Sequence, residues 1–156
     1  SRGGRTIGAA HMIPADILLV EDDEDDIELT KAALVRARVL NPVVVVHDGV
    51  TALKYLRREE PFEGASEPDL VLLDLRMPKK NGFEVLAEMD ADEVLNHIPV
   101  VVLTTSGSDE DRLEAYKSGA RAYVQKPVRA AEFRKAVESL VDFWFVVAKR
   151  PPKANF

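Results

Sequence analysis

The chain of 156 residues contains no cysteine, no long hydrophobic run and no excess of positive charge. Without cysteine it has no disulfide bond, thiolate metal site or cysteine nucleophile, and this composition suits a cytoplasmic protein. No apolar stretch approaches the roughly 20 residues that are needed to cross a membrane. The formal net charge of -6 argues against a general nucleic-acid-binding protein, which normally has a basic face.

Hydrophobic residues make up 46% of the chain and charged residues 31%, which is the balance of a globular protein. The length favours a single domain with a substantial core. Residues 1–11 have no apolar segment that would make a secretion signal, and they precede Met12. We therefore expect residues 1–11 to be a remnant of the expression vector, with a basic N-terminal arm as the alternative. Residues 12–148 would form the domain, and residues 149–156 a short tail.

Five short apolar segments rich in β-branched residues recur at residues 17–20, 43–46, 70–73, 99–103 and 122–124. Each is almost continuously apolar, as expected for a strand of a parallel sheet that is covered on both faces. Helical patterns follow them at residues 27–35, 48–56, 83–87, 109–118 and 130 to about 147. This alternation predicts an α/β fold, a doubly wound five-stranded parallel sheet with helices on both faces.

Polar side chains follow the predicted strands at the point where each strand ends. Glu21 and Asp22 follow the first strand and Asp74 the third, while Thr104 follows the fourth and Lys126 the fifth. The carboxyl ends of parallel strands meet at one edge of the sheet, where ligands of open α/β folds bind. Because carboxylates are hard ligands that suit Mg²⁺, the sequence predicts a magnesium site formed by Glu21, Asp22 and Asp74.

A carboxylate such as Asp74 is also a nucleophile that attacks phosphorus to form an acyl phosphate. Transfer of a phosphoryl group then requires in-line positioning and compensation of the charge on its oxygens. Mg²⁺ and the Lys126 ammonium would compensate that charge, and the Thr104 hydroxyl would donate a hydrogen bond. The backbone carbonyl of Arg76, two residues after Asp74, would be a further metal ligand. These groups fit one reaction, phosphoryl transfer to Asp74.

Five motifs near the predicted strand ends occur together in one family. They are Leu-Val-Glu21-Asp22, Leu-Asp74-Leu-Arg-Met-Pro78, Asn81-Gly82, Leu-Thr104-Thr-Ser and Tyr123-Val-Gln-Lys126-Pro127. From residue 17 to residue 140 the chain resembles the receiver domains of bacterial two-component response regulators. The resemblance implies a flavodoxin-like (βα)5 fold, Mg²⁺ as cofactor and Asp74 as the phosphoacceptor. Such a receiver catalyses only its own phosphorylation and dephosphorylation and is not otherwise an enzyme.

The resemblance also implies roles for individual residues. Asp22 would be a direct metal ligand, and Thr104 and Lys126 would contact the phosphoryl group. The Lys126–Pro127 peptide bond would be cis, an isomer that proline permits. Tyr123 would swing inward when Thr104 moves toward the phosphoryl group. This movement would couple the site to the surface formed by the fourth helix, fifth strand and fifth helix.

The last predicted helix ends in the apolar segment Phe143, Trp144, Phe145, Val146 and Val147. Contiguous residues cannot all face one side of a helix, so some of them should project from the domain. An exposed aromatic patch of this kind indicates a partner surface. We expect a homodimer interface or a kinase-docking surface here, with burial under the loop of residues 59–68 or the N-terminal segment as the alternative. The Trp and the Thr-Thr-Ser sequence resemble stand-alone receivers that serve bacterial phytochrome-type histidine kinases.

The leading hypothesis is a stand-alone response regulator that receives its phosphoryl group from a sensor histidine kinase, such as a bacteriophytochrome. Its output would be protein contacts or transfer to a histidine phosphotransfer protein, with neither nucleic acid nor membrane as a partner. One alternative is a binding module that works without phosphorylation. Another is a phosphatase of the haloacid-dehalogenase type, which would need a second acid where this chain has Arg76. For residues 23–26 we expect an acidic helix start, which the helix dipole favours.

Overall fold

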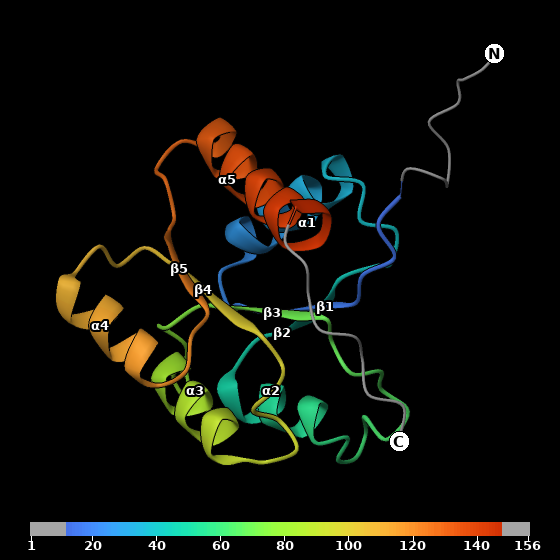
Figure 1. Cartoon of the computed structure of the whole chain (residues 1–156), viewed down its shortest axis with the longest axis vertical. Helices are drawn as coiled ribbons and strands as arrows, with labels where there is room; N and C mark the ends of the chain where they lie inside the picture. Colours follow the sequence, from blue (N-terminus) through green and yellow to red (C-terminus); the bar gives the residue numbers. More distant parts are fainter. Residues whose placement is uncertain (1–11, 148–156) are drawn as a thin grey trace.

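The structure of the protein, a computed structural model, describes residues 12–147. The predicted vector remnant, residues 1–11, and the predicted tail, residues 149–156, lie outside the described residues. The described chain forms one sheet of five parallel strands with helices on both faces (Figure 1). The predicted doubly wound α/β fold is therefore confirmed.

The strands lie in the order β2-β1-β3-β4-β5, and all neighbouring pairs are parallel. They are β1 (Ile17–Val20), β2 (Val44–Val46), β3 (Leu70–Leu73), β4 (Val100–Thr104) and β5 (Ala122–Gln125). The chain first adds β2 on one side of β1 and then β3 on the other, so the winding reverses between β1 and β3. Folds of this kind bind ligands at such a reversal, beyond the carboxyl ends of the strands.

Five α-helices follow the five strands. They are α1 (Glu24–Arg36), α2 (Gly49–Leu56), α3 (Gly82–Ala91), α4 (Asp109–Lys117) and α5 (Ala130–Asp142). Helices α1 and α5 pack together on one face of the sheet, and α2, α3 and α4 cover the other face (Figure 1). Within residues 12–147, none of the helices has the length and apolar character to cross a lipid bilayer.

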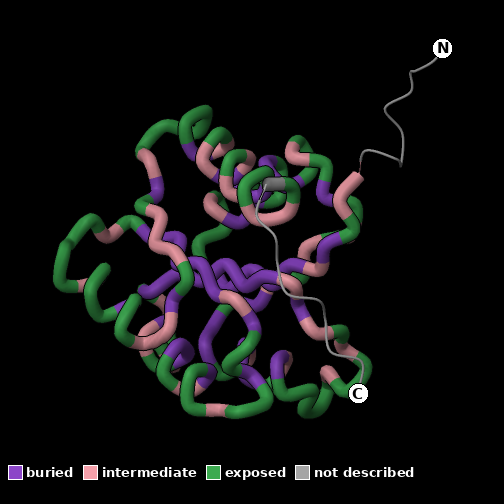
Figure 2. Tube along the Cα trace, in the orientation of Figure 1, coloured by how far each residue is buried: buried purple, intermediate pink, exposed green. Residues whose placement is uncertain are grey.

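Side chains that alternate along the central strands enter two separate cores. Leu18 and Leu73 belong to the core under α2, α3 and α4, whereas Leu19 and Leu72 belong to the core under α1 and α5. The buried strands form the layer between these cores (Figure 2). Complete burial of one such side chain contributes roughly 1.5–3 kcal/mol. The two cores thus hold the strands, and with them the polar residues at the strand ends.

Polar side chains cap the start of four helices. Asp23, Asp48, Asn81 and Ser108 each accept a hydrogen bond from a backbone N–H in the first turn of α1, α2, α3 and α4. A cap of this kind contributes about 1 kcal/mol. It also determines where each helix begins after the loop that carries the strand-end residues.

The C-terminal helix differs from the predicted regular helix to about residue 147. The α-helix ends at Asp142, and Phe143–Val147 form a π-helical turn. The neighbouring side chains of Trp144 and Phe145 both pack against the core under α1 and α5. Such a turn is wider than an α-helical one, and this packing accounts for the change of helix type.

Candidate functional site

The polar residues at the strand ends meet at the carboxyl edge of the sheet, because the backbone ladder continues past the strands. The N–H of Glu21 donates to a carbonyl of β2 at 3.0 Å, and that of Asp74 to a carbonyl of β1 at 3.0 Å. The N–H of Lys126 donates to the last carbonyl of β4 at 2.6 Å. The sheet itself therefore positions these three residues.

Three carboxylates form an acidic cluster at this edge. One ligand oxygen from each of Glu21, Asp22 and Asp74 lies within 4.8 Å of the others. Glu21 is 1% exposed and Asp74 is 7% exposed, while Asp22 faces solvent. Among residues 12–147 this is the one group of three or more side chains spaced to hold a metal ion. Hard oxygen donors with an open side fit Mg²⁺, which usually keeps several waters.

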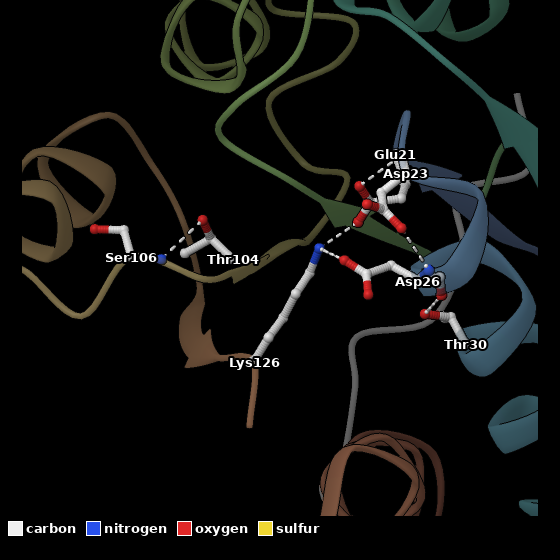
Figure 3. A network of polar contacts seen from close by, with 7 residues as sticks. All are labelled: Glu21, Asp23, Asp26, Thr30, Thr104, Ser106 and Lys126. Atoms are coloured by element: carbon white, nitrogen blue, oxygen red, sulfur yellow. Dashed lines mark hydrogen bonds and ion pairs between the residues drawn. The ribbon is translucent and has the colours of Figure 1, made fainter. Parts of the chain in front are cut away.

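Lys126 extends from the end of β5 toward Glu21, a member of the acidic cluster, and Asp26 (Figure 3). Its Nζ donates to Oε1 of Glu21 at 2.5 Å and to Oδ2 of Asp26 at 2.7 Å. The lysine side chain is only 4% exposed. A buried ammonium is stable only with charged partners and satisfied hydrogen bonds, and here two carboxylates supply both.

The surroundings shift the pKa values of Glu21 and Lys126 in the same direction. Burial raises the pKa of Glu21 from its ordinary 4.5 to about 7, opposed by the hydrogen bond from Lys126 and supported by the charge of Asp74. Burial alone would lower the pKa of Lys126, but its hydrogen bonds to Asp26 and Glu21 raise it above 10.5. Near neutral pH the lysine is therefore positively charged, whereas Glu21 can gain or lose its proton.

Thr104 is the last residue of β4 and is fully buried. Its Oγ1 accepts a long hydrogen bond, 3.4 Å, from the backbone N–H of Ser106. The hydroxyl of the half-buried Tyr123 donates to the carbonyl oxygen of Ser106 at 2.9 Å. Ser106 thus connects the two residues, Thr104 and Tyr123, for which a switching role is predicted.

Arg76 lies two residues beyond Asp74 in the loop after β3. Its Nη2 donates to Oδ2 of Asp111 at 2.7 Å. The hydroxyl of Ser106 donates to the same oxygen at 2.6 Å. Asp111, in the first turn of α4, therefore joins the loops that follow β3 and β4. A metal-binding role for the backbone carbonyl of Arg76 stays a prediction.

Two acidic residues in these contacts were missed by sequence reasoning. The interpretation as an acidic helix start fits Asp23, which caps α1, but is incomplete for Asp26, which binds Lys126. A signal was present, because Asp26 lies about one helical turn after the cap and thus on the same side as the strand end. Asp111 offered no comparable signal, since its partner Arg76 is 35 residues away in the chain.

The peptide bond between Lys126 and Pro127 is trans, which corrects the cis bond expected from the resemblance. Within residues 12–147 the one cis peptide bond joins Glu60 and Pro61. The trans form is the more stable isomer even before proline. With a trans bond the extended side chain of Lys126 already reaches Glu21.

The C-terminal apolar segment is only partly exposed. Phe143 is 55% exposed and Val146 is 62% exposed, whereas Trp144 and Phe145 are half-buried. The side chain of Val147 lies outside the described residues. A role of this segment as a partner surface stays a prediction.

The chain matches known proteins over nearly its whole length. The sequence profile of the response regulator receiver domain matches residues 17–138. Response regulator Rcp1 of Synechocystis sp. (strain ATCC 27184 / PCC 6803 / Kazusa) is 36% identical over 138 residues, which are 88% of this chain and 94% of Rcp1. The chain therefore belongs to the response regulator receiver family.

Solved structures place it beside phytochrome response regulators. The phosphorylated cyanobacterial phytochrome response regulator RcpA has a TM-score of 0.85 at 42% identity, covering 89% of this chain and 99% of that one. The Mn²⁺-bound form of Rcp1 has a TM-score of 0.83 at 35% identity, with coverages of 89% and 100%. The bacteriophytochrome response regulator RtBRR has a TM-score of 0.70 at 46% identity, covering 90% of this chain and 86% of that one. The sheet is thus that of a flavodoxin-like receiver, as predicted.

Proposed function

We propose that this receiver accepts a phosphoryl group from a sensor histidine kinase onto Asp74, with Mg²⁺ as cofactor. It then signals through protein contacts as a stand-alone response regulator. The observation that carries the proposal is the setting of Asp74, which is 7% exposed, shares a cluster with Glu21 and Asp22, and interacts with the charge of Lys126. A buried carboxylate among metal ligands and a lysine is what an acceptor of phosphoryl groups requires.

The donor set of the acidic cluster supports the metal. Asp22 and Asp74 would bind Mg²⁺ directly, and Glu21 and the backbone carbonyl of Arg76 would complete the protein ligands. When bound, Mg²⁺ offsets negative charge on the phosphoryl oxygens and orients the group. The cluster holds three carboxylates within 4.8 Å, a concentration of negative charge that favours a divalent cation.

The residues of this chain have separate parts in the proposed transfer. An oxygen of Asp74 attacks the phosphorus of a phosphohistidine, the new O–P bond forms as the P–N bond breaks, and the electron pair of that bond stays on the imidazole nitrogen. Lys126 then neutralises one phosphoryl oxygen, and the Thr104 hydroxyl donates to another. Among the described residues the Thr104 hydroxyl has one hydrogen bond, the long 3.4 Å bond from Ser106, which it can exchange for a bond to a phosphoryl oxygen.

Phosphorylation of Asp74 would affect Tyr123 through the loop that follows β4. Movement of Thr104 toward the phosphoryl group would pull on Ser106, whose carbonyl oxygen accepts from the Tyr123 hydroxyl. Tyr123 packs against the core under α2, α3 and α4, so a change in that bond would alter the position of its ring. The surface formed by α4, β5 and α5 would change as a result. A local change of charge at Asp74 would thus have an effect at a distant surface.

Similar proteins support the choice of partner. RtBRR is a bacteriophytochrome response regulator and RcpA a phytochrome response regulator, so we infer a histidine kinase of the bacteriophytochrome type. A histidine phosphotransfer protein would be a further partner. The aligned parts of this chain cover 94% of Rcp1 and 99% of RcpA. The cytoplasmic location stays a prediction from the sequence.

Two exposed apolar side chains support a homodimer through the C-terminal segment. Phe143 and Val146 project from the end of the last helix, next to Trp144 and Phe145, which pack inward. Together with Val147 these residues would form the seam between two copies. Exposed apolar groups that gather at one place favour association.

Two other functions would use the same fold. A binding module that does not need phosphorylation would have no use for the buried lysine and the three clustered carboxylates. A phosphatase would need a second acid at the position of Arg76, whose side chain instead pairs with Asp111. Phosphoacceptor activity separates both alternatives from the proposal.

The test is intact mass after incubation with acetyl phosphate or phosphoramidate. We expect one added phosphoryl group that depends on Mg²⁺ and is absent from Asp74→Asn. Binding of beryllofluoride, a stable mimic of the phosphoryl group, provides a second readout for the case of fast hydrolysis. Failure of both the mass increase and beryllofluoride binding would rule out the phosphoacceptor function and favour the binding module.

A further inference from the structure

Asp26 lies in the first turn of α1, and its backbone is held on both sides. Its N–H donates to Oδ1 of Asp23 at 3.0 Å, and its carbonyl oxygen accepts from the Thr30 hydroxyl at 2.7 Å. Thr30 is itself 1% exposed. The carboxylate of Asp26 therefore extends from a fixed point, at a helix end where the dipole favours negative charge.

Lys126 reaches the same place from a position 100 residues later in the chain. Its ammonium lies between the carboxylates of Glu21 and Asp26 (Figure 3). An ammonium has three N–H groups. Two bonds of 2.5 Å and 2.7 Å to fixed acceptors therefore leave one N–H and determine its direction.

Asp26 is a partner of the lysine and not of the metal site. The carboxylates spaced to hold a cation are those of Glu21, Asp22 and Asp74. Glu21 therefore has two tasks, because it is both a member of that cluster and a partner of Lys126. The carboxylate of Asp26 has the lysine as its one charged partner among the described residues.

We propose that Asp26 is a positioning residue for phosphoryl transfer: it holds the Lys126 ammonium so that the remaining N–H is directed to the phosphoryl group on Asp74. This inference rests on the proposed function and adds a residue of α1 to it. With Asp26 in place, the lysine keeps one anchor while Glu21 serves the metal. Without it, the ammonium would turn about a single bond and spend less time in the productive orientation.

The first test compares two variants that lose the same charge from the same helical turn. Asp26→Asn removes one of the two charged partners of Lys126, whereas Asp25→Asn changes an exposed neighbour. Beryllofluoride affinity at a fixed Mg²⁺ concentration should fall about tenfold in Asp26→Asn, because a neutral amide oxygen holds the ammonium more weakly than a carboxylate does. The rate of phosphorylation by acetyl phosphate should fall by a similar factor. Asp25→Asn should change neither value by more than about twofold.

The second test asks whether the effect passes through the lysine. In a Lys126→Met background, Asp26→Asn should cause no further loss of beryllofluoride affinity, because the group that it positions is gone. In the metal-free protein, NMR of the Lys126 Nζ should report faster exchange of the ammonium protons in Asp26→Asn than in Asp25→Asn. If Asp26 had a purely structural role, its effect on beryllofluoride affinity would not depend on Lys126. The exchange of the Lys126 ammonium protons would also not become faster in Asp26→Asn.

The outcomes separate this inference from the proposed function. Equal effects of Asp26→Asn and Asp25→Asn in a wild-type background that binds beryllofluoride would overturn the inference alone. An undiminished effect of Asp26→Asn in the Lys126→Met background would do the same. A wild-type protein that neither binds beryllofluoride nor accepts a phosphoryl group would overturn the proposed function, and this inference with it.

Discussion

The guanidinium of Arg76 donates to the carboxylate of Asp111 at 2.7 Å and so joins the loop after Asp74 to helix α4. Ser106 shares this acceptor through its hydroxyl, while its carbonyl accepts from Tyr123. The loop that follows Asp74 and the loop that carries the predicted switch therefore meet at one carboxylate. A movement in either loop must strain or break these bonds.

Replacement of Asp111 by alanine should cost more stability than replacement of Arg76 by alanine. The Arg76 side chain is 65% exposed, so its loss should cost less than about 1 kcal/mol. Asp111 is 16% exposed and accepts two hydrogen bonds, so its loss affects both loops. Urea unfolding of both single variants and the double variant should give a coupling of about 0.2–1 kcal/mol. Strictly additive effects would contradict this coupling.

The stability of the metal-free protein should fall as pH rises from about 4.5 to about 7. In this range the folded protein keeps the proton on Glu21, whose pKa is about 7, while the unfolded chain, with its ordinary value of 4.5, has released it. Because the unfolded state then binds fewer protons, the free energy of unfolding decreases with pH and levels off above about 7. Folding lowers the pKa values of the Asp48 and Glu88 carboxyl groups. These two groups therefore change the free energy of unfolding only at lower pH, below about their ordinary pKa values of 3.8 and 4.5.

Urea unfolding across this pH range measures the effect directly. Glu21→Gln should lose most of the fall in stability, because its side chain no longer titrates. Glu28→Gln, at a glutamate in α1 that is 72% exposed, is the matched control and should keep it. Identical pH profiles for wild type and Glu21→Gln would show that another group governs this range.

Mg²⁺ should stabilise the wild-type protein, because only the folded chain brings Glu21, Asp22 and Asp74 together. At a free concentration about 100 times Kd the gain should be about 2.7 kcal/mol. Thermal unfolding with Mg²⁺ and after its removal by EDTA measures this gain. Asp22→Asn should lose most of it and Asp25→Asn should keep it. Full stabilisation of Asp22→Asn would argue against Asp22 as a ligand.

Gly82→Ala should disturb the acceptor loop. A Cβ at Gly82 would lie 2.6 Å from the carbonyl oxygen of Asp74 and 2.7 Å from Cα of Leu75, and backbone atoms cannot easily move aside. We expect a loss of about 1–3 kcal/mol, typical of overpacking, together with slower phosphorylation. Gly64→Ala is the control, since nothing lies within 4 Å of the added carbon. Equal urea midpoints for the two variants would contradict the expected clash.

The homodimer hypothesis predicts that Phe143→Ser shifts the protein toward monomer, because it removes an apolar side chain that is 55% exposed. Sedimentation velocity should show dimers of wild type at concentrations where the variant is largely monomeric. Val94→Ser, at a valine that is 73% exposed elsewhere on the surface, is the control. A wild-type protein that stays monomeric with and without beryllofluoride would eliminate the dimer.

Most of the fold and the identity of the strand-end residues could be predicted from the sequence. Buried parallel strands require continuous apolar runs, and β1, β3 and β4 are buried along their whole length. Their ends meet at one edge of the sheet, so Asp74 and Lys126 could be placed near each other although 52 residues separate them. The helix ends were less predictable, as the π-helical turn after Asp142 illustrates.

The sequence by itself determined the order of strands and helices, the core and the residues delivered to the edge, because these depend on local patterns. Only the tertiary structure decided that Lys126 bonds Glu21 and Asp26, that Arg76 pairs with Asp111, and that the bond before Pro127 is trans. The physical reason is that a long side chain selects its partner among all acceptors within reach. Those acceptors are known only after α1, α4 and the loops have packed against the sheet.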